Sequence, residues 1–409
     1  MGPEALRCGL LGKTLGHSYS PGLHSLLGPY AYRLYERTEA ELPEFLRRGD
    51  WDALNVTIPY KKTVLPYCDA LSDAAKSCGS VNTLVRREGG IWGDNTDYAG
   101  FLALVDASGW DPAGKKALVL GSGGAAGAVC AALKGRGAAV TVISRRGEDN
   151  YGNLEKHGDA RAIVNTTPLG MYPENGAAPL DLRTFQKCEA VFDLIYNPAR
   201  TALLLQAESL GIPGFGGLGM LAAQAVKSSE DFTGIPVPPE RAAAAEAHLR
   251  RATENILLIG MPGCGKSTLA ALLGEATGRE VLDADEVLAR EAGCSIPEIF
   301  AREGEEGFRR RETAVLAGLG KLSGKIIATG GGCVTREENY PLLHQNGRIF
   351  LIRRDPAALP REGRPLSRDA DLREMARQRE PFYRRFADGE IDNNGSPETA
   401  LRQLMEAIG

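Results

Sequence analysis

The sequence predicts an α/β protein built from parallel sheets covered by helices, and three observations lead to this prediction. Short runs rich in Val, Ile and Leu recur along the 409 residues, at CGLLG, ALNVTI, KALVLG, AVTVIS, ILLIG, KIIATG and RIFLI. Most of them are followed by polar or alanine-rich stretches with helical character. Two of the runs lead directly into glycine-rich loops, at residues 121–126 and 260–267. A chain of this length is expected to form two or three domains.

Composition argues against several classes of protein. The net charge is −4, with 48 Lys plus Arg against 52 Asp plus Glu, so charge does not favour a nucleic acid or a membrane surface as partner. No apolar run approaches the ~20 residues of a membrane span, and the N-terminus lacks a secretion signal. The eight cysteines contain no CxxC pair, which argues against a disulfide framework or a zinc site. We expect a cytoplasmic enzyme with small-molecule substrates, and its oligomeric state stays open.

The clearest domain boundary is the stretch GIPVPPERAAAAEAHLRRATEN, at residues 234–255. Its prolines block continuation of the preceding helix, and the alanine-rich part after them is expected to form a largely solvated helix. Such a helix would be a semi-rigid spacer between domains, because a helix is stiffer than an unstructured tether.

The loop after ILLIG matches the pattern G-x-x-x-x-G-K-[ST], which binds the phosphates of nucleoside triphosphates when it joins a strand to a helix, as it is predicted to do here. The glycines let backbone N–H groups turn toward phosphate oxygens, the lysine neutralises charge, and the hydroxyl reaches Mg²⁺. The alternative is a glycine-rich turn without a ligand. We predict that the nucleotide is bound by Gly260, Gly263, Cys264, Gly265, Lys266, Ser267 and Thr268.

Residues that suit phosphoryl transfer follow this loop. In VLDADEVL, Asp283 and Asp285 alternate at the end of a predicted strand, where one carboxylate can hold Mg²⁺ and the other the acceptor hydroxyl. Any single arginine here could be a solvated helix residue, but a guanidinium beside a glycine loop suits carboxylate or phosphate. The arginines and the glycine loop that stand out are Arg309, Arg364, Arg379, Gly330, Gly331 and Gly332.

Together these motifs make residues 255–408 resemble shikimate kinase, in the order P-loop, D-x-D, EIFAREGEEGFRRRE, GGG, GRPL and REPFYR. The resemblance implies a small P-loop kinase with a lid over ATP. It implies that Ser267 and Asp283 serve Mg²⁺ and that Lys266 serves the phosphates. It further implies that Asp285 accepts the proton of the shikimate 3-hydroxyl and that Arg364 is the lid arginine on the transferring phosphate. The substrate carboxylate and hydroxyls would be held by Arg309, Arg379, Gly330, Gly331 and Gly332.

Two features depart from the pattern of that family. The lid stretch PAALPREGRPLS is short, and DNNGSPET lacks the arginine that the family usually has near the adenine. Both departures concern adenine binding and the lid, and the residues implied in phosphoryl transfer are all present.

The other glycine loop, GSGGAAG, fits the G-x-G-x-x-A form of a dinucleotide-binding turn with Gly121, Gly123 and Ala126. Alone the pattern is weak, because a turn with only a packing role has the same spacing. The next predicted strand, AVTVIS, leads into Arg145 and Arg146, and arginine there suits the 2′-phosphate of NADP, whereas NAD favours an acidic residue. We predict NADP(H) binding by Gly121, Ser122, Gly123, Gly124, Ala125, Ser144, Arg145 and Arg146.

Polar motifs upstream of that loop carry candidate catalytic groups. The motifs are GHSYSPGLHS, NVTIPYKK, GSVNTL and GDNTDYAGF, and they single out Ser18, Ser20, Thr57, Lys61, Asn82 and Asp97. Each motif alone could serve a turn, since Ser, Asn and Asp favour turns. Together with the glycine loop, NTTPLGM and GLGMLAAQA, they make residues 6–234 resemble shikimate dehydrogenase.

That resemblance implies a catalytic pair, in which Lys61 exchanges the proton during hydride transfer and Asp97 orients it, binds a ring hydroxyl and favours the protonated lysine. It implies that the substrate carboxylate is bound by Ser18 and Ser20, and the hydroxyls by Thr57, Asn82 and Gln224. The residues implied to line the nicotinamide end are Asn165, Thr166, Gly219 and Met220.

The two resemblances divide the chain into a substrate domain at 1–98 with a return helix at 219–235, an NADP domain at 99–218, a linker helix at 236–253 and a kinase domain at 254–409. Between Arg146 and the run AIVNTT the chain is short, where the dehydrogenase family usually has a helix, a strand and another short helix. The NADP domain is therefore expected to be trimmed by one strand.

The sequence thus predicts a bifunctional enzyme that reduces 3-dehydroshikimate with NADPH and phosphorylates shikimate with MgATP. Three alternatives stay open. The N-terminal half could be a quinate or shikimate dehydrogenase that uses NAD, the kinase half could act on another polyol acid, or the N-terminal half could be a shikimate sensor without turnover. A sensor needs no proton-transfer pair, so the presence of Lys61 and Asp97 argues against the third alternative.

Overall fold

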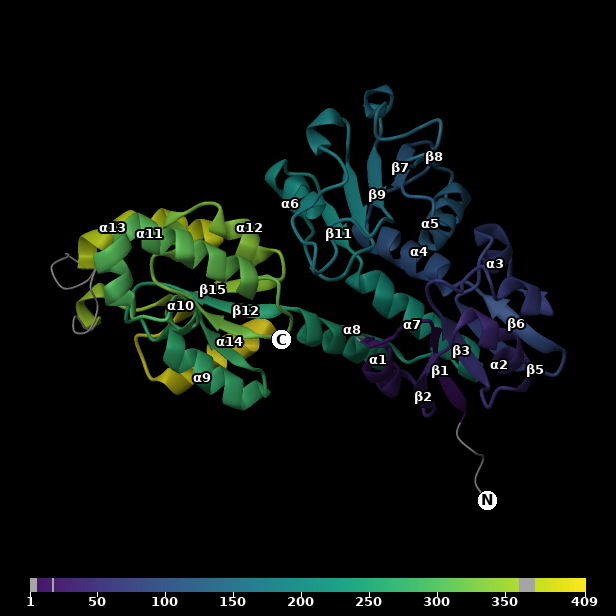
Figure 1. The fold of residues 1–409 in the computed structure, drawn as a ribbon, viewed down its shortest axis with the longest axis horizontal. Helices are drawn as coiled ribbons and strands as arrows, with labels where there is room; N and C mark the ends of the chain where they lie inside the picture. Colours follow the sequence, from purple (N-terminus) through teal and green to yellow (C-terminus); the bar gives the residue numbers. More distant parts are fainter. Residues whose placement is uncertain (1–5, 17, 360–371) are drawn as a thin grey trace, which may run out of the picture. The chain divides into compact units, whose positions relative to one another are not determined.

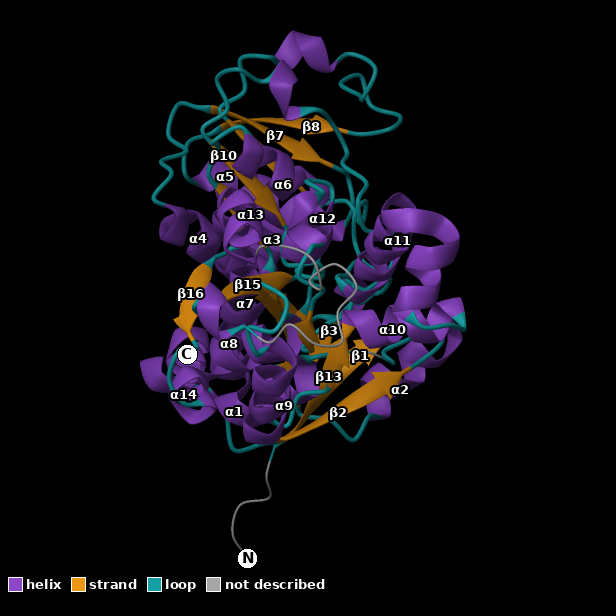
Figure 2. Cartoon of the chain, turned by 90° about the vertical axis from the view of Figure 1, so that its left-hand side faces the viewer, coloured by secondary structure: helices purple, strands orange, loops and turns teal. Residues whose placement is uncertain are grey.

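The structure, a computed structural model, describes residues 6–16, 18–359 and 372–409 (Figure 1, Figure 2). The chain divides into two compact units. The first comprises Met1–Tyr196 and Thr201–Arg250, and the second comprises Asn197–Arg200 and Arg251–Gly409. No helix of the described ranges is both long enough and apolar enough to cross a bilayer.

The seven apolar runs that predict strands all form strands. They are β1 (Arg7–Gly12), β3 (Ala53–Val56), β7 (Lys116–Leu120), β8 (Ala139–Ile143), β12 (Asn255–Ile259), β14 (Ile326–Ala328) and β15 (Gly347–Arg353). The other strands are β2 (Ala31–Glu36), β4 (Ala70–Leu71), β5 (Thr83–Arg87), β6 (Gly90–Asp94), β9 (Ala162–Asn165), β10 (Ala190–Asp193), β11 (Gly214–Gly216), β13 (Val281–Asp283) and β16 (Gly389–Asp392). Continuous apolar runs predict strands well here because a strand buried on both faces needs no polar alternation.

Helices follow most of these strands. In chain order they are α1 (Ser20–Leu27), α2 (Leu42–Arg48), α3 (Asp73–Cys78), α4 (Thr96–Ser108), α5 (Gly124–Gly135), α6 (Ala202–Ser209), α7 (Leu218–Thr233), α8 (Pro239–Thr253), α9 (Lys266–Thr277), α10 (Ala284–Ala292), α11 (Ile296–Leu319), α12 (Asn339–His344), α13 (Leu372–Phe386) and α14 (Pro397–Ile408). Short 3₁₀ helices are η1 (Glu39–Glu41), η2 (Leu65–Tyr67), η3 (Leu154–His157), η4 (Leu182–Thr184), η5 (Cys333–Thr335) and η6 (Pro356–Ala358).

The N-terminal sheet has the strand order β2-β1-β3-β5-β6-β4. β1 pairs in parallel with β2 and β3, but β5 runs antiparallel to both β3 and β6. The expectation of parallel sheets throughout is therefore wrong for this sheet. The reason is the link of two residues, Glu88 and Gly89, between β5 and β6, because so short a connection joins only antiparallel neighbours.

The second sheet, in the order β11-β10-β9-β7-β8, is parallel at every pairing. Alternate residues of β7 enter different cores: Ala117 and Val119 join one buried cluster, and Leu118 and Leu120 join the other. Both faces of this sheet are thus covered, with α5 on one and α6 on the other (Figure 1). Residues 144–161, all described, contain the short helix η3 and no strand, which agrees with the expected trimming of this domain.

Helix α7, which corresponds to the predicted return helix at 219–235, connects the two parts of the first unit. It packs along α4, and the predicted boundary after residue 98 falls inside α4. Met220 of α7 belongs to the core under the second sheet, whereas Phe232 of α7 belongs to a core cluster with Cys8 of β1.

Helix α8 forms where the linker helix is expected, and most of its side chains are exposed. One stripe is buried: Ala245 and Leu249 belong to one core cluster with Leu23 and Leu27 of α1. Residues four apart lie on one face of a helix, so this face is fixed to the first unit. The helix is thus largely solvated, as expected, and is also docked through Ala245 and Leu249, which the sequence pattern did not predict.

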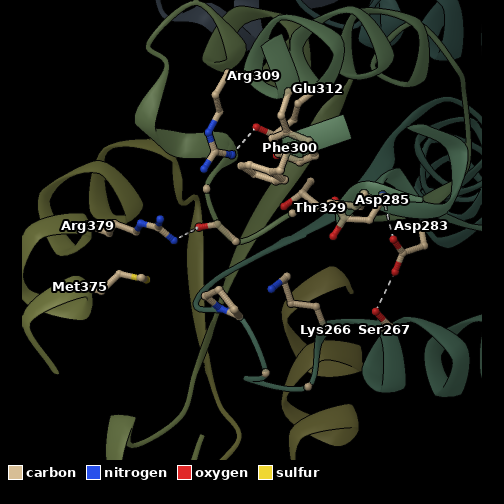
Figure 3. A pocket seen from close by; sticks show the side chains of 18 of the residues that line it. Lys266, Ser267, Asp283, Asp285, Phe300, Arg309, Glu312, Thr329, Met375 and Arg379 are labelled. Atoms are coloured by element: carbon tan, nitrogen blue, oxygen red, sulfur yellow. Dashed lines mark hydrogen bonds and ion pairs between the residues drawn. The ribbon is translucent and has the colours of Figure 1, made fainter. Parts of the chain in front are cut away.

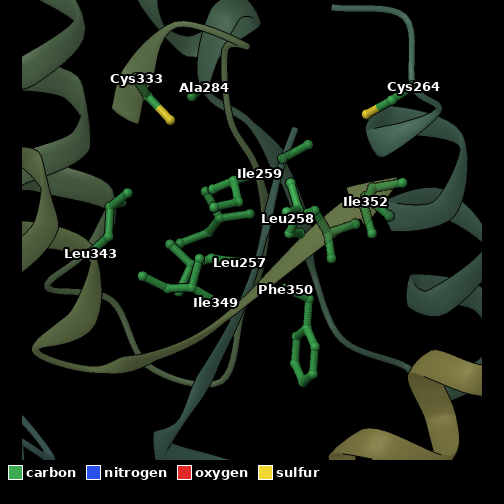
Figure 4. Close-up of a cluster of buried hydrophobic side chains, with 14 of the residues drawn as sticks. Leu257, Leu258, Ile259, Cys264, Ala284, Cys333, Leu343, Ile349, Phe350 and Ile352 are labelled. Carbon is green, nitrogen blue, oxygen red and sulfur yellow. The ribbon is translucent and has the colours of Figure 1, made fainter. Parts of the chain in front are cut away.

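The second unit is built on a parallel sheet in the order β13-β14-β12-β15-β16. Helices α9 and α14 lie on one side of it and α11 and α12 on the other (Figure 1). Its core includes Leu257, Leu258 and Ile349 from the two central strands (Figure 4). Because these strands run in parallel, the loops that follow β12, β13, β14 and β15 all emerge at one edge of the sheet, where ligands of open α/β sheets bind.

Candidate active sites

A cavity of about 270 Å³ in the first unit gathers the predicted substrate and catalytic residues. The predicted residues that line it are Ser18, Ser20, Thr57, Lys61, Asn82, Asp97, Ala125, Met220 and Gln224. They come from segments up to some two hundred positions apart in the chain, so only the fold brings them together. The lining also includes Asn55, Leu194, Tyr196 and Gly217, together with apolar residues of β1, β3 and α7.

Lys61 and Asp97 form an ion pair at the centre of this lining. Lys61 Nζ lies 2.5 Å from Asp97 Oδ2, and their side chains are 18% and 11% exposed. Asp97 lies in the first turn of α4, where the helix N-terminus favours a negative charge. Its second oxygen, Oδ1, accepts a hydrogen bond from Asn82 Nδ2 at 2.9 Å. The arrangement provides an ammonium group whose position is held by a fixed carboxylate, which is what proton transfer to a bound substrate requires.

A buried polar network supports this pair from behind. Asn82 Oδ1 accepts a hydrogen bond from the backbone N–H of Thr96 at 2.7 Å, which fixes the amide orientation. Asn55 Nδ2 donates to Ser228 Oγ at 2.8 Å, and Ser228 in turn contacts Thr96 Oγ1 at 3.1 Å. Strands of the first sheet, α4 and α7 are therefore joined beneath the cavity by side chains without net charge, which hold the lining in one arrangement.

The dinucleotide-type loop lies next to the ion pair. α5 begins at Gly124, and a Cβ at that position would lie 3.7 Å from Lys61 Cδ. Ser122 and Gly123, just before the helix, are exposed, so the helix N-terminus is open to a phosphate. β7 and β8 pair up to Leu120 and Ile143, which places the loop after β8 beside the glycine loop. Ser144 is half-buried there, and Arg145 and Arg146 are exposed.

Internal hydrogen bonds hold two side chains of the NTTPLGM segment. Asn165 is fully buried, donates from Nδ2 to Asp193 Oδ1 at 3.0 Å, and accepts from Thr167 Oγ1 at 2.7 Å. Thr166 Oγ1 donates to the carbonyl of Leu120 at 2.7 Å. Neither side chain lines the cavity, nor does Gly219. Burial raises the pKa of Asp193 to about 6, and three hydrogen bonds oppose that shift. The donors are Asn165, the backbone N–H of Ile195 and Thr201, so the buried carboxyl group links the segments that follow β9 and β10.

A second cavity, of about 560 Å³, lies at the open edge of the sheet in the second unit (Figure 3). The predicted residues that line it are Gly263, Gly265, Lys266, Ser267, Thr268, Asp283, Asp285, Arg309, Gly330, Gly331, Gly332 and Arg379. Gly260 and Cys264 of the same loop are buried outside the lining. Arg364 lies outside the described residues, as does part of the lid stretch.

The loop after β12 has the backbone of a phosphate cradle. Gly260, Gly263 and Gly265 have φ values of 142°, 84° and 101°, which residues other than glycine rarely adopt. Lys266 Nζ bends back over the loop and donates to the carbonyls of Gly260 at 2.9 Å and Met261 at 3.1 Å. The ammonium group is thus placed inside the loop. Lys266 is also the first residue of α9, which begins where the loop ends.

Two hard oxygen ligands stand at the start of α9 and the end of β13. Ser267 Oγ donates to Asp283 Oδ2 at 2.7 Å, so the two oxygens lie next to each other at the cavity wall (Figure 3). Hydroxyl and carboxylate oxygens are the ligands that Mg²⁺ prefers, and the remaining ligands would come from phosphate and water. The residues present therefore fit a nucleotide-bound magnesium ion.

Asp285 is the most strongly perturbed carboxyl group of this cavity. Burial first, and then the charges of Asp283 and Glu312, raise the pKa of Asp285 to about 6, although Lys266 and Arg309 oppose the shift. A carboxylate whose pKa is close to neutrality can accept a proton from a substrate hydroxyl.

Arg309 is buried and held by Glu312, with Arg309 Nη1 2.6 Å from Glu312 Oε2. Glu312 Oε1 is buried without a hydrogen-bond partner among the described residues, and burial raises the pKa of Glu312. A Cβ on Gly330 would lie 2.6 Å from that oxygen, so a side chain there would crowd Glu312. Arg379 Nη1 donates to the carbonyl of Gly331 at 3.1 Å. Two guanidinium groups therefore face one glycine loop, an arrangement suited to an anionic polyol.

Sequence reasoning missed several lining residues. Glu312 stands three positions after Arg309, and a carboxylate at helical i, i+3 spacing from a candidate arginine could have indicated the pair. Tyr196 follows β10 by three residues, at the edge where lining residues of parallel sheets gather. Arg354, the residue directly after β15, lines the second cavity for the same reason.

Two family models match separate parts of the chain. The model described as shikimate dehydrogenase substrate binding domain matches residues 10–84, and the model described as shikimate kinase matches residues 262–409. Among curated proteins, the shikimate dehydrogenase (NADP(+)) of Oleidesulfovibrio alaskensis is 41% identical over 265 residues, which are 58% of this chain and 94% of that protein.

Solved structures of dehydrogenases are similar to the same part. Shikimate 5-dehydrogenase from Thermus thermophilus, solved in complex with NADP(H) and shikimate, has a TM-score of 0.54 at 32% identity and covers 60% of this chain and 99% of its own. Quinate dehydrogenase from Corynebacterium glutamicum, in complex with NAD, has a TM-score of 0.53 at 27% identity, with 59% and 98% covered. The chain therefore belongs to the shikimate dehydrogenase family through its N-terminal part and carries a shikimate kinase domain in its C-terminal part.

Proposed function

We propose that this protein reduces 3-dehydroshikimate to shikimate with NADPH and phosphorylates shikimate to shikimate 3-phosphate with MgATP. The observation that carries the proposal is the presence in one chain of two residue sets whose reactions follow one another. One is the Lys61–Asp97 pair beside the dinucleotide loop. The other is Asp285 with Lys266, Ser267 and Asp283 in the second cavity, called the phosphate cavity below. The product of the first reaction is the substrate of the second, so each set supports the other.

In the reduction, Lys61 donates a proton to the carbonyl oxygen that becomes the 3-hydroxyl. NADPH, when bound on the glycine loop, supplies the hydride. Asp97, which accepts a hydrogen bond from Asn82, holds the ammonium group in place. Asp97 and Asn82 also bind a ring hydroxyl, while Ser18 and Ser20 bind the substrate carboxylate. The further polar groups that would fix the ring are Asn55, Thr57, Tyr196 and Gln224. Held in this way, the substrate presents its carbonyl to the proton donor with little loss of freedom on reaction.

In the phosphorylation, Asp285 accepts the proton of the shikimate 3-hydroxyl. MgATP, when bound, supplies the phosphoryl group. Lys266 and the backbone N–H groups of the loop would bind its phosphates, and Ser267 and Asp283 would hold the metal ion. The substrate would be held by Arg309, Arg379 and the glycine loop Gly330–Gly332. Positioning and charge supply most of the catalysis of such a transfer, which suits the density of fixed charges in this cavity.

The experiment that tests the proposal is a single reaction with purified protein, 3-dehydroshikimate, NADPH and MgATP. NADPH consumption is followed by absorbance and the products are identified by mass spectrometry. Shikimate 3-phosphate should form only when both cofactors are present. If neither NADPH nor NADH is consumed while added shikimate is phosphorylated, the first unit is a shikimate sensor. If ATP is hydrolysed equally without shikimate, the kinase acts on another acceptor.

The choice between NADP and NAD should depend on the two exposed arginines after β8. Replacement of both Arg145 and Arg146 by alanine is expected to lower kcat/KM for NADPH about tenfold or more, because charged hydrogen bonds to a 2′-phosphate are lost, and to leave NADH unaffected. Initial rates with each coenzyme at equal concentration measure this preference.

The matched control for that experiment is Arg136→Ala, which removes an exposed arginine of the same unit that pairs with Asp106. A double variant that keeps its full preference for NADPH would contradict the assignment of the arginines. A wild-type protein that prefers NADH, and that oxidises quinate, would favour the alternative of a quinate or shikimate dehydrogenase that uses NAD.

A further inference from the structure

Arg354 enters the phosphate cavity from the strand next to the P-loop. β15 pairs in parallel with β12, with Ile259 opposite Leu351, so the residues after both strands emerge side by side. The contact is close, since a Cβ on Gly260 would lie 2.6 Å from the carbonyl oxygen of Ile352. Arg354 follows two residues later and lines the cavity together with Lys266 and Ser267. Its place in the fold is therefore set by the same sheet edge that holds the P-loop.

The residues on either side of Arg354 are held by specific partners. Arg353 contacts Glu380 at 2.7 Å and Glu390 at 2.6 Å. On the other side, the backbone N–H of Asp355 donates to Asn394 Oδ1 at 2.7 Å. Both neighbours are thus anchored to α13, to β16 and to the residues after β16. The backbone at Arg354 is fixed on both sides before any ligand is present.

The guanidinium of Arg354, by contrast, has no hydrogen bond or ion pair with any of the described residues. The other cations that line the cavity are all engaged: Lys266 with loop carbonyls, Arg309 with Glu312, and Arg379 with the carbonyl of Gly331. An exposed arginine beside a phosphate-binding loop, with a fixed backbone and an unengaged guanidinium, is available for an anionic ligand.

The position of Arg354 indicates which anion it meets. It lines both the phosphate cavity and a neighbouring cavity of about 380 Å³, which is also bounded by Met261, Pro356 and Asn394. Met261 belongs to the P-loop, and β15 is the strand that pairs with β12 directly before that loop. The phosphates that the P-loop binds are therefore the anions expected beside Arg354.

We propose that Arg354 binds a phosphate group of the nucleotide in the kinase unit. This inference rests on the proposed function and adds a residue to its nucleotide site. A bidentate guanidinium contact would neutralise negative charge of the nucleotide phosphates that Lys266 alone does not compensate. The pairing of β15 with β12 would hold Arg354 beside the P-loop.

The test compares Arg354→Gln and Arg354→Lys with Arg402→Gln in the full-length protein. Arg402 has an exposed side chain on α14 and lines neither of the two cavities, which makes it a matched exposed arginine. Affinity for ADP by titration calorimetry and the KM values for ATP and shikimate are measured. We expect Arg354→Gln to weaken ADP binding and to raise the KM for ATP about tenfold, with partial recovery in Arg354→Lys and the KM for shikimate unchanged.

Each other outcome overturns the inference. Unchanged ADP affinity and KM for ATP in Arg354→Gln would show that the guanidinium does not bind the nucleotide. If Arg354→Gln weakens inhibition by shikimate 3-phosphate and leaves ATP kinetics unchanged, the guanidinium binds the transferred phosphate of the product. An equal loss in Arg402→Gln would indicate a general charge effect. Because ADP binding is measured without turnover, the test stays decisive even if the wild-type protein fails to phosphorylate shikimate.

Discussion

Replacement of Lys61 by methionine is expected to lower kcat for 3-dehydroshikimate reduction by about 10²–10⁴-fold, the range that general acid catalysis contributes. Methionine is only one atom shorter than lysine but cannot donate a proton. The carboxylate of Asp97, 2.5 Å away in the wild-type protein, would lose its counter-ion, so binding of the substrate should also weaken. Shikimate phosphorylation by the same preparation should stay unchanged, because the two sites use different residues. NADPH consumption and kinase turnover measure the two activities.

Lys62 provides the matched control for this variant, since it carries the same charge at the next position and its side chain is exposed. Lys62→Met should retain both activities. Loss of both activities in Lys61→Met would contradict the picture of independent sites, and full reduction activity would remove Lys61 from the mechanism.

Replacement of Asp285 by asparagine is expected to lower kcat for shikimate phosphorylation by about 10²–10⁴-fold, with reduction of 3-dehydroshikimate intact. Asparagine has nearly the same shape but cannot accept the proton of the 3-hydroxyl. It also removes a charge that faces Asp283 and Glu312, so the variant should fold at least as stably as the wild-type protein. Glu286→Gln, at the exposed neighbouring position of α10, is the control. Wild-type kcat in Asp285→Asn would exclude Asp285 as proton acceptor.

The pH dependence of the kinase follows from the same residue. Burial and the nearby charges of Asp283 and Glu312 raise the pKa of Asp285 to about 6, and the protonated carboxyl group cannot accept a proton. Activity should therefore be full above this value and fall about tenfold per pH unit below it, whereas an ordinary aspartate would stay active to about pH 4. A profile of kcat/KM for shikimate at saturating MgATP measures this limb. The limb should vanish in Asp285→Asn, and its persistence there would assign it to another group.

Features carried by contiguous residues could be predicted from the sequence. The glycine loops at 121–126 and 260–267 lie between a strand and a helix, as predicted, because their spacing encodes a local turn. Lys61, Asn82 and Asp97 could be selected because each stands in a short motif. That they share one cavity with Gln224 follows from the packing of α7 along α4, which no local pattern encodes.

The features that sequence reasoning missed depend on distant contacts. Asn165 stands in a recognisable motif, yet its amide is turned inward by the buried carboxyl group of Asp193. Ala245 and Leu249 look like ordinary members of a solvated alanine-rich helix until α1 supplies the apolar surface that covers them. Arg354 resembles any arginine at the end of a strand, and only the pairing of β15 with β12 places it at the P-loop.

The sequence by itself thus determined the chemistry of this protein: two phosphate-binding loops of different design, a lysine–aspartate set and an aspartate pair that suit hydride and phosphoryl transfer. Only the tertiary structure decided which of these residues face a common cavity, which are engaged in internal hydrogen bonds and which cation remains available for a ligand. The physical reason is that turns, strands and caps depend on neighbours along the chain. Burial, pKa values and the orientation of side chains depend on whatever the fold packs against them, often far away in sequence.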